Sequence, residues 1–325
     1  MTSTAAHHLR HIPLGLAFAF ALLVNPARAD EGGVSFWAPG QFGSLAAVPS
    51  DPGWSLALSY FHASADAGLS KNFLVGGRLT AGIDATADLV FAFPTYTFAQ
   101  PVFGGQAALS VGWAAGQARG SAGIGLAGPR GNSFDSSQSD KVTGGSDVYG
   151  LGTLKWHDGN DNFMVYGMFG IPVGAYRVGR LANLGTNHGA IDGGGGYTYF
   201  DEKKGREFSI VGGLTYNFEN TDTHYQNGVD AHVDWAASQF LSEQVHVGLV
   251  GYFYDQLTGD SGSGATLGPF KSRVAAVGPQ VGYFFPIGAQ KGYLNLKAYW
   301  EFAAENRAKG WNVWLTLALP LSGAR

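Results

Sequence analysis

Apolar and polar residues alternate strictly in several stretches of the chain. In "GVDAHVDWAAS" (228–238), acidic residues and a histidine occupy every second position, and Val, Ala and Trp lie between them. A period of two residues is typical of a β-strand, because successive side chains of a strand point to opposite faces. The same period recurs in "QVHVGLVGYFYDQ" (244–256) and "YLNLKAYWEF" (293–302). The alternation predicts strands with one apolar face and one polar face.

The pattern predicts twelve strands, most of them ten residues or longer. Their expected ranges are 53–63, 85–97, 104–117, 146–157, 161–172, 193–201, 205–218, 228–239, 243–256, 270–285, 291–302 and 310–319. Strands of soluble proteins average about 5–6 residues, whereas a transmembrane strand needs about 9–11. Expected connections alternate between long ones, such as 64–84 and 118–145, and short ones, such as 98–103 and 158–160. Outer-membrane barrels show this asymmetry.

A closed barrel in a membrane explains how one strand can carry both an apolar face and a polar face. In lipid every backbone polar group must be paired, so strands can span a membrane only as a closed barrel. Val229, Ala231, Val233 and Trp235 are then expected to face lipid. The fold class predicted is all-β, a transmembrane antiparallel up-and-down β-barrel of about twelve strands. A soluble β-sandwich with one wet face is the alternative, but the polar faces carry few lysines and many Tyr, Gln, Ser and Gly residues.

Tryptophans are expected to form interfacial girdles at the ends of the strands. The residues assigned to this role are Trp54, Trp113, Trp156, Trp235, Trp300, Trp311 and Trp314.

Composition supports an exported membrane protein. Charged residues make up 14% of the chain, against about 25% in a typical soluble domain. The absence of cysteine excludes a disulfide scaffold and thiolate chemistry. The net charge of −4 gives no sign of nucleic-acid binding.

The N-terminus has the features of a signal peptide. The apolar run 12–24 is too short to span a bilayer as a helix, and "ARA" at 27–29 is a small-x-small cleavage signal. The expected division is a signal peptide over 1–29, an irregular segment over 30–52 and an outer-membrane barrel over 53–325. The segment 30–52 is expected either to plug the barrel or to form a periplasmic lead-in.

The candidate functional residues are the polar and aromatic side chains on the inward strand faces. They are Asp230, His232, Asp234, His246, Tyr252, Tyr254, Gln256, Lys297, Tyr299 and Glu301. One interpretation is a polar network with Lys297 and Arg273 as the opposite charges, which filters solutes. An unperturbed histidine titrates near pH 6.5, so permeability is expected to change between about pH 5 and 8. The alternative is a metal site, which needs three or four converging ligands. The network is favoured, and no metal or cofactor is expected.

Hydrolytic chemistry finds little support in the sequence. It needs Ser, His and an acid in contact, and no G-x-S-x-G motif is present. Ser261 lies in "GDSGSGA", which is typical of a glycine-rich turn. No enzymatic activity is expected, although a barrel enzyme acting on lipids remains an alternative, as does a structural barrel without transport.

The chain after the signal peptide resembles a known family over nearly its whole length, most densely from 215 to 317. The stretches "NFENTDTHYQNGVDAHVDWAASQF", "GLVGYFYDQLTGDSGSGATLGPF", "GPQVGYFFPIG" and "WEFAAENRAKGWNVWLTLA" are similar to the SphA-like, "MetA-pathway of phenol degradation" family of outer-membrane transporters. Its motif residues outside the inward set include Asn217, Glu219, Asn220, Thr223, Tyr225, Asp260, Ser261, Gly262 and Gly264. The C-terminus "PLSGAR" departs from barrels that end in an aromatic residue.

The resemblance implies uptake of hydrophobic or aromatic compounds and supplies no catalytic residues. With the exported barrel, it predicts a passive channel for phenol-like, hydrocarbon or long-chain molecules. The expected partners are outer-membrane lipids and small hydrophobic solutes, and no nucleic acid. The sequence does not decide the oligomeric state.

Overall fold

The computed structural model describes residues 35–75, 78–127 and 133–321, so the predicted signal peptide lies outside the described residues. These residues form thirteen strands and irregular connections. The strands are β1 (Gly53–Val75), β2 (Arg78–Thr97), β3 (Gln106–Ala127), β4 (Ser133–Gly145), β5 (Val148–Asp158), β6 (Asp161–Ile171), β7 (Ala190–Asp201), β8 (Arg206–Asn217), β9 (Asp230–Phe240), β10 (Val245–Gln256), β11 (Arg273–Ile287), β12 (Gln290–Glu305) and β13 (Lys309–Pro320). No helix in this part of the chain is long and apolar enough to cross a membrane.

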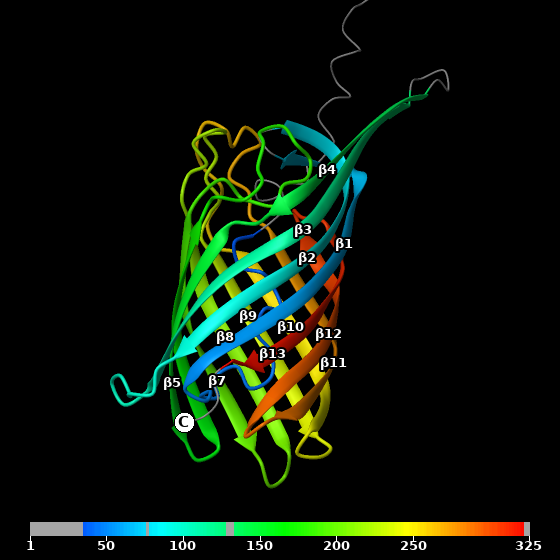
Figure 1. The fold of residues 1–325 in the computed structure, drawn as a ribbon. Helices are drawn as coiled ribbons and strands as arrows, with labels where there is room; N and C mark the ends of the chain where they lie inside the picture. The colour runs from blue at the N-terminus through cyan, green and yellow to red at the C-terminus, as the bar shows by residue number, and fades with distance from the viewer. Residues whose placement is uncertain (1–34, 76–77, 128–132, 322–325) are drawn as a thin grey trace, which may run out of the picture.

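Antiparallel pairing closes the strands into a barrel (Figure 1). β1 pairs with both β2 and β13, and β2 pairs in turn with β3. β3 pairs with β5 over one half and with β4 over the other. β4 and β5 are therefore consecutive parts of one barrel strand, interrupted at Ser146 and Asp147. The thirteen strands make a twelve-stranded closed barrel, which confirms the predicted fold class.

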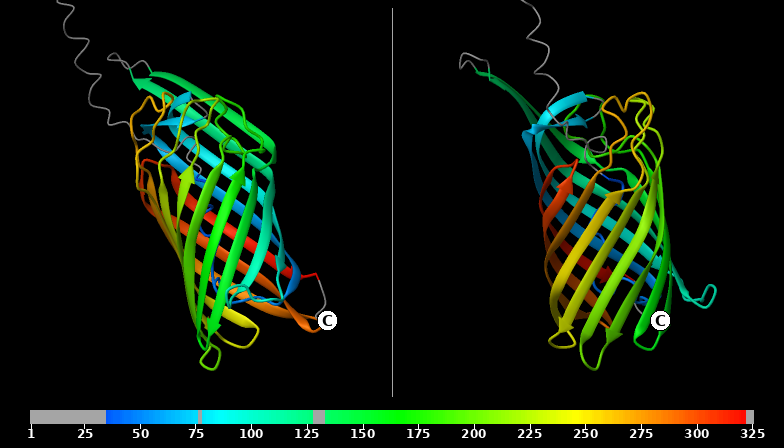
Figure 2. Two further views of the ribbon diagram at one scale, coloured as in Figure 1. Left: turned by 90° about the vertical axis from the view of Figure 1, so that its left-hand side faces the viewer. Right: turned by 180° about the vertical axis from the view of Figure 1, so that it is seen from behind.

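The prediction of long loops is wrong at two places in the chain. The expected loops 64–84 and 118–145 are mostly strand, because β1 with β2 and β3 with β4 continue as long hairpins. Asp66 pairs with Asp84, and the pairing resumes beyond a register shift at Asn72. Figure 2 shows the β3–β4 hairpin projecting beyond the end of the barrel that carries the long loops. These sequences lack an alternating apolar face, but backbone pairing outside lipid does not require one.

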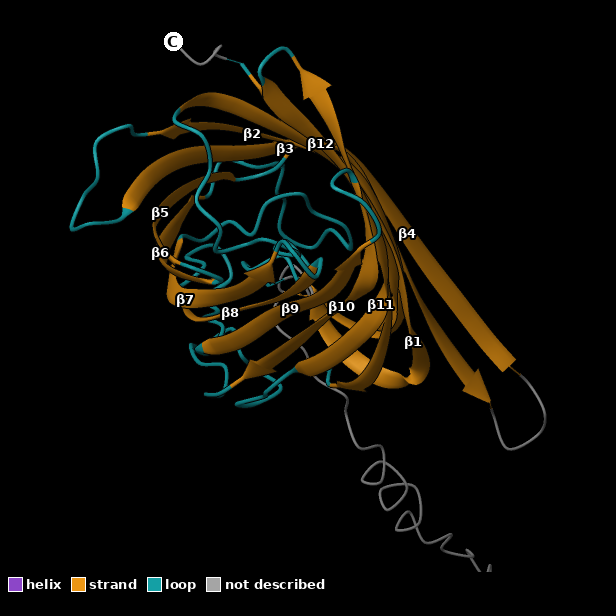
Figure 3. Cartoon of the chain, turned by 90° about the horizontal axis from the view of Figure 1, so that it is seen from below, coloured by secondary structure: helices purple, strands orange, loops and turns teal. Residues whose placement is uncertain are grey.

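The two faces of the barrel strands have the predicted polarity. Along β9, Asp230, His232 and Asp234 are buried while the residues between them are partly exposed. Leu249 on β10 is 53% exposed on the outer face. Seen along the barrel axis, the ring of strands surrounds irregular chain (Figure 3).

The tryptophan girdle is only partly as predicted. Trp54, Trp113, Trp300 and Trp311 are exposed. Trp314, in contrast, is 3% exposed and belongs to an interior cluster with Phe91. Its assignment to the girdle is wrong, because it lies an even number of positions from the inward-facing Asn312 and therefore shares its face.

We expect Leu249→Arg to destabilise the barrel by about 2–4 kcal/mol, because Leu249 lies in the middle of β10 and a cation there would sit in hydrocarbon. Leu241→Arg is the matched control, since Leu241 lies in the short turn after β9 and is 65% exposed. It should cost about 0–1 kcal/mol. Denaturant titrations in lipid vesicles measure both, and equal losses would contradict the outward orientation of Leu249.

Candidate functional site: the barrel interior

The interior of the barrel holds the chain that precedes β1. Residues 35–52, here called the luminal segment, run through the ring of strands in irregular conformation (Figure 1, dark blue). Within the segment, Trp37 is 1% exposed and Ala47 is fully buried. The segment ends beside the short turns, where Ser50 N donates to Gln106 Oε1 at 2.8 Å.

Two opposite charges hold the middle of the luminal segment. Asp234 on β9 accepts hydrogen bonds from Gly40 N at 2.9 Å and from Phe42 N at 3.0 Å. Lys297 on β12 donates from Nζ to Gly40 O at 2.5 Å and to Phe42 O at 3.3 Å. Both side chains are almost fully buried, at 2% and 4% exposure. Each charge is therefore compensated by the backbone of residues 40–42 and by the charge across it.

Glycine is needed at the centre of this contact. Gly40 has a φ of +83°, in the left-handed region that side chains disfavour. A Cβ atom there would lie 2.9 Å from the ring of Tyr299, which is itself 1% exposed. The tyrosine ring thus packs directly against the backbone that Asp234 and Lys297 hold.

Further polar contacts fix the rest of the segment. Glu207 on β8 accepts from Ser44 Oγ at 2.8 Å and from Leu45 N at 3.0 Å. Ser44 Oγ also lies 2.8 Å from Ser238 Oγ. Lys155 on β5 donates to Val48 O at 3.1 Å. Side chains on β3, β5, β8, β9 and β12 therefore all contribute to holding this one segment.

An aromatic and acidic cluster holds the beginning of the segment. Trp37 stacks on His232, with ring centroids 3.8 Å apart and an interplanar angle of 13°. His232 Nε2 lies 2.8 Å from Asp192 Oδ2, and Asp192 also accepts from Thr215 Oγ1. His232 therefore joins the luminal segment to β7 and β8 and does not line open space.

The sequence analysis did not single out Asp192, Glu207 or Lys155. Asp192 lies in a glycine-rich stretch, and Lys155 lies in a stretch that mixes polar and apolar residues. Glu207 is the second residue of β8, beside a turn. The two-residue alternation could have identified Glu207, because it lies two positions before Ser209 and on the same inward face of β8.

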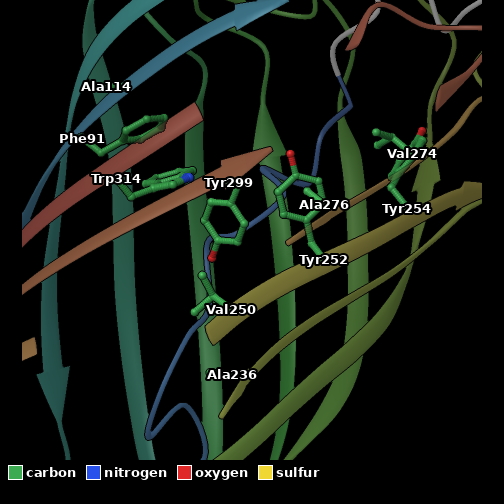
Figure 4. Packing of buried hydrophobic residues seen from close by; sticks show 10 residues of the cluster. All are labelled: Phe91, Ala114, Ala236, Val250, Tyr252, Tyr254, Val274, Ala276, Tyr299 and Trp314. Carbon is green, nitrogen blue, oxygen red and sulfur yellow. The ribbon is translucent and has the colours of Figure 1, made fainter. Parts of the chain in front are cut away.

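A cavity of about 330 Å³ lies between the luminal segment and one side of the barrel. Its wall is mainly apolar, and it includes Phe61, Leu89, Phe91, Phe93, Ala118 and Leu181. Phe36 and Trp37 of the luminal segment form part of the same lining. Figure 4 shows Phe91 and Trp314 at this wall, with ring centroids 5.6 Å apart. The barrel interior thus has an apolar side that leaves space and a polar side that holds the segment.

Only two of the predicted inward residues line this cavity, Tyr252 and Glu301. Tyr252 OH donates to Glu301 Oε1 at 2.8 Å and accepts from Asn312 Nδ2 at 2.8 Å. Gly310 N donates to the other carboxylate oxygen of Glu301 at 2.8 Å. The carboxylate of Glu301 on β12 is therefore held by donors from β10 and β13 at the boundary between the two sides.

The remaining predicted inward residues lie at different levels of the barrel. His246 Nε2 lies 2.9 Å from Tyr293 OH, near the short turns. Gln256 lies near the long loops, where its Nε2 donates to Asp260 Oδ1 at 2.6 Å. Asp230, at the same end, accepts from Asn217 Nδ2 at 2.8 Å.

Among the described residues, no three His, Cys, Asp or Glu side chains converge as the ligands of a metal ion would. His246 and Asp234 are held in separate contacts, the first with Tyr293 and the second with the luminal segment. The structure therefore does not bring His232, Asp234 and His246 together, as the alternative interpretation of a metal site would require.

The motif residues of the resemblance gather where the connections 218–229 and 257–272 meet. Tyr225 OH donates to Asp260 Oδ2 at 2.5 Å, and the backbones of Gln226 and Ser261 pair as an isolated bridge. Gly262 and Gly264 approach the preceding connection closely, since a Cβ on either would collide with the carbonyl oxygen of His224 or of Thr223. These residues hold the connections 218–229 and 257–272 in contact with each other.

Further motif residues make additional contacts in and around these two connections. Asn220 pairs with the backbone of Tyr225 and donates from Nδ2 to Tyr176 OH at 3.0 Å. Glu219 Oε1 lies 3.1 Å from His224 Nδ1 at the protein surface. Ser261 Oγ lies 3.5 Å from Gln226 Oε1, so its hydrogen-bond partner is an amide.

Comparisons with known proteins agree with this architecture. A family model described as "Putative MetA-pathway of phenol degradation" matches residues 65–317. No curated protein matches the sequence. The COG4313 outer membrane channel from Pseudomonas putida F1 is similar in structure, with a TM-score of 0.66, 14% identity, and coverage of 87% of this chain and 98% of that one.

Two other solved barrels are more distantly similar. A Pseudomonas aeruginosa FadL homologue has a TM-score of 0.41 and 8% identity, and the match covers 83% of this chain and 91% of that one. The translocator domain of the autotransporter NalP from Neisseria meningitidis has a TM-score of 0.44 and 9% identity, with coverage of 84% and 90%. The chain thus shares the closed β-barrel fold of the Pseudomonas putida outer membrane channel.

We expect Asp234→Asn to loosen the luminal segment, because it removes one buried charge and leaves Lys297 uncompensated. Breaking one partner of a buried charged contact costs about 3 kcal/mol, which corresponds to a roughly 150-fold faster exchange of the Gly40 and Phe42 amides. Hydrogen exchange followed by mass spectrometry or NMR measures this. Lys291→Met, at the exposed start of β12, is the control. Unchanged protection of both amides would refute the role of Asp234.

Proposed function

Because the chain belongs to the MetA-pathway of phenol degradation family, we propose that it is a passive outer-membrane channel for small hydrophobic molecules, aromatic ones in particular. The similar structure from Pseudomonas putida is described as an outer membrane channel, which supports the transport class. The observation that carries the proposal is the apolar cavity inside the barrel.

The size and lining of the cavity fit a small apolar solute. A volume of about 330 Å³ lies at the lower end of the range of ligand sites, and an apolar cavity of about 150 Å³ already holds benzene. Phe61, Phe91 and Phe93 offer ring faces and edges, and Tyr252 and Asn312 offer polar atoms at one boundary. An aromatic body with one polar group matches this arrangement.

The luminal segment serves as the plug of the channel in this proposal. Phe36 and Trp37 line the cavity, and the segment continues from there to the short turns. With the short turns on the periplasmic side, as in bacterial outer-membrane barrels, a solute that leaves the cavity toward the periplasm must displace part of the segment. Hydrogen bonds to backbone groups, and no covalent crosslink among the described residues, hold the segment against the barrel wall, so it can yield.

A strain that lacks the gene is expected to take up an alkylphenol more slowly at limiting concentration, while its lysate metabolises the compound normally. The intact gene should restore uptake. Ala87→Trp should not, because the indole would occupy the cavity that Ala87 lines. Val90→Trp on the outer face of β2, where Val90 is 51% exposed, is the matched control and should restore uptake. Equal uptake with and without the gene would refute transport.

A disulfide between residues 44 and 238 tests the plug. The hydroxyl oxygens of Ser44 and Ser238 are 2.8 Å apart and the chain has no native cysteine, so Ser44→Cys combined with Ser238→Cys places two thiols in contact. We expect uptake to fall on oxidation and to recover on reduction, with each single variant as control. Unchanged uptake in the oxidised protein would show that the solute leaves without moving the segment.

A further inference from the structure

We propose that the cavity selects aromatic solutes that carry a carboxylate, and that Arg307 holds this carboxylate. The inference rests on the proposed function and narrows its substrate class. It comes from a cation, Arg307, two of whose donor nitrogens have no hydrogen-bond partner among the described residues.

Arg307 lies in the turn between β12 and β13 and lines the apolar cavity. Its guanidinium carbon lies 5.2 Å from the ring centroid of Tyr254, which fixes one face of the group. Within the described part of the chain, Nε and Nη1 are shielded from solvent and have no hydrogen-bond partner. Buried donors without partners are rare in folded proteins and are costly when the group is charged. The guanidinium is thus positioned, and two of its nitrogens, Nε and Nη1, are unsatisfied.

The neighbouring acid does not satisfy Arg307. The carboxylate of Glu301 is turned toward other donors, since Oε1 accepts from Tyr252 OH and Oε2 accepts from Gly310 N. No ion pair forms between Glu301 and Arg307 among the described residues. Glu301 instead orients the tyrosine and the start of β13.

The charges that line the cavity leave an excess of one positive charge. The charged lining residues are Arg119, Glu301 and Arg307. Arg119 is exposed to solvent, and its Nε donates to Gln117 Oε1 at 3.0 Å. Arg307 is the shielded one of the two cations. A solute with a single negative charge would neutralise the excess.

A carboxylate matches the donors of Arg307 better than a phenol does. Its two oxygens accept parallel hydrogen bonds from the guanidinium fork, and the bonds are charge-assisted. A phenol offers one weaker, neutral acceptor and a donor that Arg307 cannot use. The acceptor available to a phenol is Asn312 Oδ1, which is buried, has no partner among the described residues, and belongs to a residue that also lines the cavity. The two head groups therefore use different residues of one cavity.

Equilibrium binding to the purified full-length protein in detergent at pH 8 tests the inference. The probes are 4-butylbenzoate and 4-butylphenol, which share the same apolar body. We expect the benzoate to bind about 10-fold more tightly, and Arg307→Met to weaken it by about 10-fold or more while phenol binding changes less than about 3-fold. Arg307→Lys keeps the charge and loses the fork, so it should give an intermediate loss.

Arg177→Met is the matched control, because Arg177 is exposed on a long loop and does not line the cavity. It should leave both affinities unchanged. Dihexanoyl phosphatidate distinguishes a soluble acid from a membrane lipid, and tighter Arg307-dependent binding of this lipid than of the benzoate would overturn the proposal in favour of a lipid site. Heat-modifiable migration of each variant on gels verifies that the barrel has folded.

Equal affinity for the two probes, or benzoate binding that is indifferent to Arg307→Met and Arg307→Lys, would overturn the proposal. In that case retained phenol binding would leave the channel function standing. Failure of both probes to bind, together with normal alkylphenol uptake in the strain that lacks the gene, would refute the channel function itself.

Discussion

The whole structure depends on a closed ring of backbone hydrogen bonds. Within lipid no water is available to pair with N–H and C=O groups, so every barrel strand needs a neighbour on both sides. Pairing of β1 with β13 and of β2 with β3 closes the ring. Closure fixes which residues face outward, and it encloses a lumen that the inward side chains must fill or hydrate.

The lumen is filled by the chain itself. Inward polar residues on β8, β9 and β12 find partners in the backbone of the luminal segment, as Glu207, Asp234 and Lys297 show. Buried charges are tolerated only when paired or hydrogen-bonded. The segment forms turns of its own, such as the one closed by Gln41 N and Ala38 O, but no regular secondary structure, so other backbone groups in it depend on the barrel for partners. Each part satisfies the polar groups of the other.

The lumen is asymmetric, and this asymmetry relates the structure to the proposed function. The wall formed by β8–β12 is rich in polar groups and holds the segment, whereas β1–β3 contribute phenylalanine, leucine and alanine side chains that leave a cavity. A solute with an apolar body finds its place on the second wall, and the boundary with Tyr252, Glu301 and Arg307 supplies the polar contacts. The luminal segment and the cavity share Phe36 and Trp37, so in the proposed function a solute in the cavity contacts the segment that serves as the plug.

The sequence by itself determined the barrel, the number of its strands and the face of each residue along β9 and β10, because lipid imposes a two-residue period on every spanning strand. It could not reveal the extended hairpins of β1–β4, which leave the lipid and lose that period. It identified Asp234, His232 and Lys297 as inward, but their partners depend on strand register and on the path of residues 35–52, which no local pattern encodes. Trp314 and Arg307 acquire their roles only in the tertiary structure, since closure alone decides what lies opposite an inward side chain.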